Sequence, residues 1–236
     1  MIKRVFKPGF GLIALSLFLL VFTFSCNFNG RKGIKDEGVI EYSITYPDSA
    51  TMRYESNMRP EKMIVKFKEK KTLTNIQGLS GAVSLSFIHN VDERLTIILV
   101  KLFNKKLFYT EKYNDGDLPL VYSQMPKVML EPTSDNVKFQ GYDCFRYIGV
   151  FEGDSLKKFD ILFTNQIGIE NPNEKTPYAS INGLLMAFTV KLYGQTMNLR
   201  AISISKGNVH DSDFEVPRDY EMVSKETIND IFELMN

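Results

Sequence analysis

The chain has 236 residues with 29 basic and 28 acidic side chains, and its formal net charge is +1 at pH 7. The first 25 residues hold three basic and no acidic side chains, which leaves 26 basic against 28 acidic residues from position 26 onward. This balance excludes the strongly basic surface on which nucleic-acid binding depends. The remaining length of about 200 residues suits one domain with a substantial hydrophobic core.

The N-terminal stretch 1–25 has the pattern of a cleaved secretory signal peptide. Lys3, Arg4 and Lys7 form a basic head, and an uncharged apolar run follows at 9–24. A basic region, a short apolar region and small residues before the cleavage point are typical of such signals. The apolar run is too short for a membrane-spanning helix, which needs about 20 apolar residues.

The residue directly after this signal, Cys26, resembles the acylated first residue of a mature bacterial lipoprotein. We therefore expect a signal peptide at 1–25, a lipid such as palmitate on Cys26, a polar tether over 26–35 and a single domain over 36–236. The alternatives are cleavage by an ordinary signal peptidase, which leaves a free thiol at Cys26, and a retained membrane anchor.

The resemblance to lipoproteins also implies a location. The first acidic residue after Cys26 is Asp36, and no aspartate follows the cysteine directly. Surface-exported lipoproteins of Bacteroidetes carry acidic residues close to the cysteine, and many inner-membrane lipoproteins carry an aspartate directly after it. We therefore expect a lipid anchor in the outer membrane of the cell envelope, with the domain facing the periplasm.

Alternation of apolar and polar residues predicts a mainly β domain. Every second residue is apolar in 40–46, 63–67 and 83–87, whereas 95–102 is apolar on both faces, as in a central strand. Further strands are expected at 107–109, 144–151, 156–163, 184–193 and 196–204, with hairpin turns at 152–155 and 194–195. These strands predict one antiparallel sheet, curled by its twist into a half-barrel.

One amphipathic helix is predicted at the end of the chain. Ser224 is a suitable N-cap, and Ile228, Ile231, Phe232 and Met235 are spaced three and four residues apart. This apolar stripe must bury against the sheet. We therefore expect the helix to cover the mouth of the half-barrel, together with a few short helices.

Proline and glycine mark the connecting segments. The stretches 46–60 and 113–135 are interpreted as long loops or short covering helices. Gly141 and Gly183 each precede a strand, where a positive φ or a close backbone approach favours glycine. Pro217 is expected to end a strand just before it.

Few residues are candidates for chemistry. His89 precedes polar residues and is interpreted as a turn histidine, and Cys144 as a small buried residue of a strand. His210, Asp211 and Asp213 offer one imidazole and two carboxylates, but zinc sites normally show three or four recognisable ligands, so we interpret them as a solvated loop. We therefore expect no catalytic residue, no metal, no cofactor and no enzyme activity. The sequence does not identify ligand-binding residues.

The C-terminal half resembles a protein family. Its motifs are GYDC at 141–144, KFDILFT at 158–164, INGLLMAF at 181–188 and FEVPRDY at 214–220. They resemble motifs of uncharacterised Bacteroidetes lipoproteins and periplasmic proteins, including the group named for a G-L-P-G-L-I motif, although this chain lacks the proline. The resemblance implies an architecture similar to that of the lipoprotein carriers LolA and LolB, a curled antiparallel sheet with helices in its mouth.

Two functions are compatible with these features. The chain has 18 Phe, 11 Tyr and no Trp, and its apolar strands provide more apolar surface than a one-sided core requires. The first hypothesis is therefore a membrane-anchored module that binds a lipid, an acyl chain or another apolar ligand, unless the helix and loops cover this surface. The second is an accessory lipoprotein that docks on an outer-membrane protein complex.

Overall fold

The computed structural model describes residues 37–47, 59–114, 117–154, 156–192, 194–205 and 207–233. The predicted signal peptide, the predicted lipidation site Cys26, the tether and Met235 lie outside the described residues. The chain divides into two compact units, Met1–Lys32 and Gly33–Asn236, and every described residue belongs to the second. Within the described ranges, no helix is long and apolar enough to cross a membrane.

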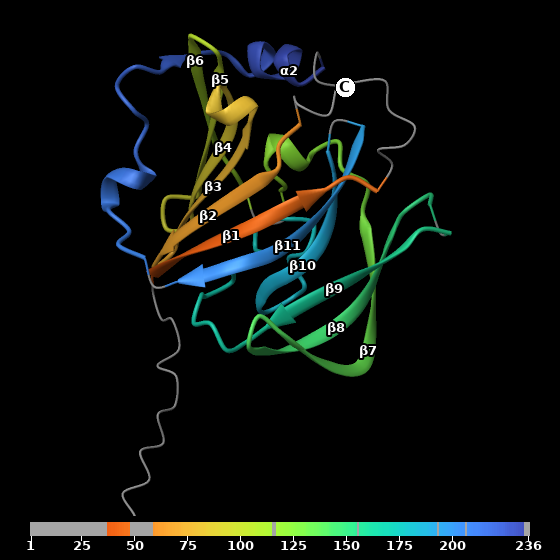
Figure 1. Ribbon diagram of the computed structural model, residues 1–236. Coiled ribbons are helices and arrows are strands. Elements are labelled where there is room, and N and C mark those ends of the chain that lie inside the picture. The colour runs from red at the N-terminus through yellow and green to blue at the C-terminus, as the bar shows by residue number, and fades with distance from the viewer. Residues whose placement is uncertain are drawn as a thin grey trace, which may run out of the picture. The chain divides into compact units, whose positions relative to one another are not determined.

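The described residues form one twelve-stranded sheet followed by a short α-helix (Figure 1). The order of strands across the sheet is β12-β6-β5-β4-β3-β2-β1-β11-β10-β9-β8-β7. The strands are β1 (Glu37–Thr45), β2 (Lys62–Lys68), β3 (Lys71–Gly78), β4 (Val83–Asn90), β5 (Leu95–Leu102), β6 (Lys105–Lys112), β7 (Val128–Phe139), β8 (Tyr142–Phe151), β9 (Lys158–Thr164), β10 (Leu184–Leu192), β11 (Gln195–Ser205) and β12 (Glu221–Met222), and the helix is α2 (Lys225–Glu233).

Two antiparallel meanders, β1 to β6 and β7 to β11, meet where the first strand pairs with the eleventh. Ile40 lies opposite Ile204, and Ile44 lies opposite Leu199. The short β12 adds in parallel to β6, so that β12 and β7 are the two edges and the sheet does not close. The predicted fold class is confirmed: a curled, open, mainly antiparallel sheet with a C-terminal helix.

Apolar side chains from the two faces of the sheet form two separate clusters. The inner cluster includes Ile40, Tyr42, Phe67, Ile98 and Leu199, all nearly inaccessible to solvent. The outer cluster consists of Ile88, Ile97, Leu99, Val209 and Phe214. Because successive residues of a strand point to opposite faces, β5 contributes to both clusters, which explains why its sequence is apolar on both sides.

The C-terminal helix forms where its sequence pattern predicts it. The Ser224 hydroxyl oxygen accepts a hydrogen bond from the Thr227 backbone N–H at 3.3 Å and caps the first turn. Ile228 and Phe232 are buried in the inner cluster, and Ile231 is half-buried beside it. A helix this short is marginal in water by itself, so its contact with the sheet stabilises it.

Three strands differ from the sequence-based expectations, and one of them is the two-residue β12, which was not predicted. β3 was not predicted, because its residues Lys71–Gly78 are mostly polar and half-buried on both faces. β7 begins at Val128 and therefore occupies the end of 113–135, which we expected to be loop or helix. Proline is tolerated there because β7 is an edge strand, and its register shifts between Pro132 and Asn136. The earlier part of 113–135, expected to be a long loop or short covering helices, holds the short 3₁₀ helix η4 (Leu120–Tyr122).

Local backbone geometry explains why glycine is needed at two positions. It also corrects two details of the sequence-based prediction. Gly141 has a φ of 79°, and a Cβ on Gly183 would lie 2.3 Å from the Asn165 Oδ1 atom, so both need glycine as expected. The turn between β10 and β11 falls one residue earlier than predicted, with Gly194 last in the loop. Phe214 ends the 3₁₀ helix η5 (Asp211–Phe214) and does not belong to a strand. Its side chain packs against the sheet in the outer cluster.

Candidate ligand-binding pocket

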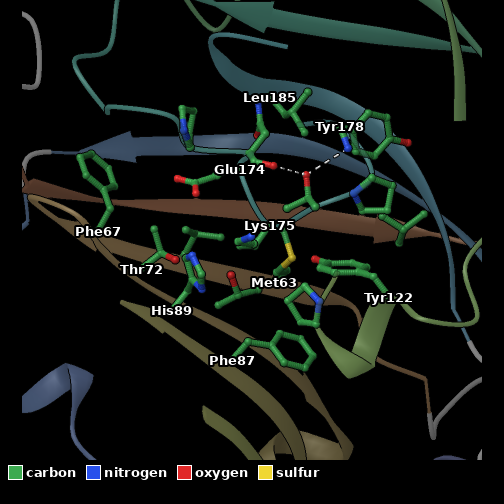
Figure 2. Close-up of a pocket in the computed structure, with 18 of the residues that line it drawn as sticks. Met63, Phe67, Thr72, Phe87, His89, Tyr122, Glu174, Lys175, Tyr178 and Leu185 are labelled. Atoms are coloured by element: carbon green, nitrogen blue, oxygen red, sulfur yellow. Dashed lines mark hydrogen bonds between the residues drawn. The ribbon is translucent and has the colours of Figure 1, made fainter. Parts of the chain in front are cut away.

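A pocket opens on the face of the sheet that carries the inner cluster (Figure 2). It encloses a cavity of about 130 Å³. β1, β2, β4, β10 and β11 contribute inward side chains to its walls, among them Tyr42, Met63, Phe87, Leu185 and Leu199. These side chains converge because residues two apart on each strand point to the same face and the sheet curls around them.

The loop between β9 and β10 covers this pocket. Each residue of 169–178, the covering loop, contributes to the lining, together with residues of η4. The Asn173 side-chain amide donates hydrogen bonds to the carbonyl oxygens of Ile181 and Gly183, both at 2.8 Å. Asn173 is buried, so these bonds satisfy both of its amide hydrogens and fix the loop to the start of β10.

The C-terminal helix does not have the covering role that we expected. No described residue of α2 lines the pocket. Its buried residues Ile228 and Phe232 pack into another part of the inner cluster. The helix is therefore a packing element of the domain, and the 169–178 loop takes the position over the pocket.

Aromatic rings line the apolar end of the pocket. The ring centroids of Tyr42 and Phe188 are 5.7 Å apart, those of Tyr178 and Phe188 are also 5.7 Å apart, and both pairs meet edge to face. The Tyr42 hydroxyl donates to the Leu185 carbonyl oxygen at 2.8 Å, and the Tyr178 hydroxyl donates to the Thr189 carbonyl oxygen. Burial raises the pKa of Tyr42 and of Tyr178 above the ordinary tyrosine value, so both remain neutral phenols.

Polar side chains gather at the other end of the pocket. Thr72 on β3 lies opposite His89 on β4, which lies opposite Thr96 on β5, and all three line the pocket. The His89 Nδ1 atom lies 3.2 Å from the Thr96 hydroxyl, and its Nε2 atom lies 3.1 Å from the Tyr113 hydroxyl. Lys175 reaches this group from the covering loop, and Figure 2 shows its side chain near His89.

The charge at this end comes from Lys175 and not from the histidine. Burial, and next the positive charge of Lys175, lower the pKa of His89 to about 4. His89 is therefore neutral at pH 7, and each of its ring nitrogens has a hydroxyl partner. The polar end thus places the buried Lys175 beside neutral hydrogen-bonding groups, while Lys70 and three glutamates also line the pocket.

The aspartates near His210 pair with lysines of β2. Asp211 pairs with Lys68 at 2.9 Å and Asp213 pairs with Lys66 at 2.7 Å, outside the pocket. The hydrogen bond from Lys68 lowers the pKa of the Asp211 carboxyl. Across the described residues, no group of three or more His, Cys, Asp and Glu side chains is placed to hold a metal ion.

The sequence-based analysis missed the residues of the polar end. His89 was interpreted as a turn histidine, but it lies on β4 with its ring half-buried in the pocket. Lys175 was not singled out, although the connection 165–183 exceeds the length of about 12–15 residues above which loops are often functional. The interpretation of Cys144 is confirmed, because it lies in β8 with its side chain buried.

Comparisons with known proteins give a likeness of fold. No family model matches the sequence, and no curated protein matches it. The solved structures of PNGF-II in the P21 and C2 space groups resemble the chain with TM-scores of 0.49 and 0.50 and 14% sequence identity. Each covers 85% of this chain, but the chain spans only 34% and 33% of the length of those two proteins. At this identity, the likeness concerns the arrangement of the chain and not its activity.

Proposed function

We propose that the domain is a binding module whose pocket takes up an acyl chain or another small apolar group. The observation that carries this proposal is the pocket itself, with its apolar walls inside the curled sheet and its cover formed by the 169–178 loop. A concave, mainly apolar pocket with a few polar groups is the usual form of a small-molecule site. If the inner face of the sheet were fully packed by side chains, this cavity would not exist.

The size of the cavity limits what can enter. The cavity volume of about 130 Å³ is close to that of an engineered apolar cavity of about 150 Å³ in another protein, which binds benzene. It is smaller than the ~300–1,000 Å³ of sites that enclose drug-sized ligands. We therefore infer that a short acyl chain, or the end of a longer one, occupies the cavity while the rest of the ligand remains outside.

The chemistry of the lining favours binding over catalysis. The lining residues that the structure describes include no serine, cysteine or aspartate. The tyrosines Tyr42 and Tyr178 are used as hydrogen-bond donors to the backbone. We therefore infer a carrier or sensor of an apolar ligand, held at the periplasmic face of the outer membrane by a lipid on Cys26.

The test is a substitution that fills the cavity. Val65 on β2 lines the pocket and is half-buried, so Val65→Phe places a ring where the ligand would insert. Val137→Phe is the matched control, because Val137 is 37% exposed on the edge strand β7. Binding is measured with the neutral fluorescent probe N-phenyl-1-naphthylamine and its displacement by decanol.

We expect Val65→Phe to weaken decanol binding by about tenfold or more, the equivalent of losing the burial of two methylene groups. Val137→Phe should bind decanol as the wild-type domain does. Far-UV circular dichroism of both variants shows whether the sheet is retained. Wild-type affinity in a folded Val65→Phe variant would place the ligand elsewhere and refute the proposal.

A further inference from the structure

Lys175 is an unusual residue for an apolar pocket. Its side chain is only 7% exposed, and it lines the pocket. Its Nζ atom donates to the Asn114 carbonyl oxygen at 3.2 Å and lies 4.0 Å from the centre of the Tyr113 ring. An ammonium group has three donors, and the described residues provide an acceptor oxygen for one of them.

No carboxylate of the described residues forms an ion pair with Lys175. Other described lysines do form ion pairs with carboxylates. Lys70, for example, pairs with Asp92 at 2.9 Å near the pocket rim. Burial of a charged group is costly unless an opposite charge and hydrogen bonds compensate for it. The contact with the Tyr113 ring compensates for only part of this cost. The pocket therefore contains a cation with the capacity to bind an anion.

The groups around Lys175 suit a small anion. Thr72 and Thr96 carry hydroxyl groups that can donate hydrogen bonds, and His89 is neutral at pH 7 and does not repel the lysine. Three acidic residues also line the pocket: Glu69 and Glu170 are exposed at its rim, and Glu174, next to Lys175 in the covering loop, is half-buried. A charge-assisted hydrogen bond formed in such a buried site is about twice as strong as one between neutral groups.

We propose that Lys175 recognises the head group of the ligand, and that the ligand is an amphiphile with one carboxylate and an apolar tail. The carboxylate accepts a hydrogen bond from the Lys175 ammonium at the polar end, and the tail fills the apolar end. This assignment rests on the proposed binding function, because it requires a ligand in the same pocket. It identifies the ligand class as monocarboxylic acids of the fatty-acid type.

A carboxylate fits this site better than a phosphate does. Phosphate groups carry up to two charges and are typically bound by several cationic groups or by arginine forks. The lining holds Lys175 and the exposed, ion-paired Lys70 as its cations and has no arginine among the described residues. The glutamates at the rim add repulsion that a doubly charged head group would feel more strongly.

The test compares two ligands of equal length that differ in the head group. Decanoate and decanol each displace N-phenyl-1-naphthylamine from the wild-type domain, from Lys175→Met and from Lys101→Met. Lys101 is the matched control, because it is half-buried and also donates to a backbone carbonyl, that of Gly81 at 2.8 Å, but lies outside the pocket.

We expect the wild type and Lys101→Met to bind decanoate more tightly than decanol by about tenfold to a hundredfold, as one hydrogen bond to a charged group allows. Lys175→Met should lose this preference while its affinity for decanol is unchanged. Equal binding of decanoate and decanol by the wild type would overturn the role of Lys175, and this readout needs no variant to fold.

The outcomes separate the two proposals. If neither decanoate nor decanol displaces the probe from the wild type, the binding function itself fails. If both ligands bind but Lys175→Met keeps the preference, or Lys101→Met loses it, only the role assigned to Lys175 is refuted. Tighter displacement by decyl phosphate than by decanoate would refute the carboxylate as the recognised head group.

Discussion

The buried histidine of the pocket predicts how the stability of the domain depends on pH. The pKa of His89 is about 4 in the folded domain, against an ordinary value of 6.5 in the unfolded chain. The groups that hold it neutral are the apolar surroundings and the Lys175 charge. Between these two pH values, the unfolded chain binds more protons than the folded one. Stability contributed by His89 is therefore complete above about pH 6.5 and decreases as the pH falls toward 4.

The size of this effect follows from the two pKa values. One pKa unit corresponds to about 1.4 kcal/mol, so the full contribution of His89 is at most about 3 kcal/mol, of which about 2 kcal/mol is lost between pH 7.5 and pH 5. His89→Gln removes the titrating ring and keeps a polar side chain at this position. We expect the variant to lose about 2 kcal/mol less stability than the wild type over this pH range.

Urea unfolding followed by far-UV circular dichroism measures this difference, since the chain has no tryptophan for fluorescence. His210→Gln is the control, because His210 is exposed and the chain contains just these two histidines. This variant retains His89 and should keep the loss of stability attributed to that residue. If His89→Gln also keeps the wild-type slope between pH 7.5 and 5, folding does not lower the pKa of His89, and the description of the polar end is wrong.

Two further predictions concern the helix and the anchor. Phe232→Ala should lower the free energy of unfolding by about 3–5 kcal/mol, because the ring is 5% exposed in the inner cluster, whereas Met222→Ala, at a 62% exposed position, should change it by less than about 0.5 kcal/mol. Equal effects of these two substitutions in urea unfolding would show that the helix is not packed on the sheet. Cys26→Ala should release the protein from membranes or leave its precursor uncleaved. Membrane attachment at the wild-type level after a carbonate wash would mean that something other than a lipid on this cysteine anchors the chain.

Local sequence patterns determined much of the fold. The alternation in β1 and the two-sided apolar run in β5 each reflect which side chains are buried, and burial repeats along a strand with a period of two. The Ser224 cap and the spacing of Ile228 and Phe232 likewise predict α2, because both signals lie within a short stretch of the chain. β3 escaped detection because its side chains are half-buried on both faces, so burial leaves no alternation in the sequence.

The tertiary structure alone decided where the pocket lies and what it contains. The pairing of β1 with β11 joins segments that are far apart in the sequence, and their register depends on how the whole inner cluster packs. The polar end combines Thr72, His89 and Thr96 from three strands with Lys175 from a loop that follows β9. No short sequence motif predicts this cluster, because its residues come together only when the sheet curls and the loop folds over it. The neutrality of His89 follows from its burial in this arrangement and from the neighbouring charge of Lys175.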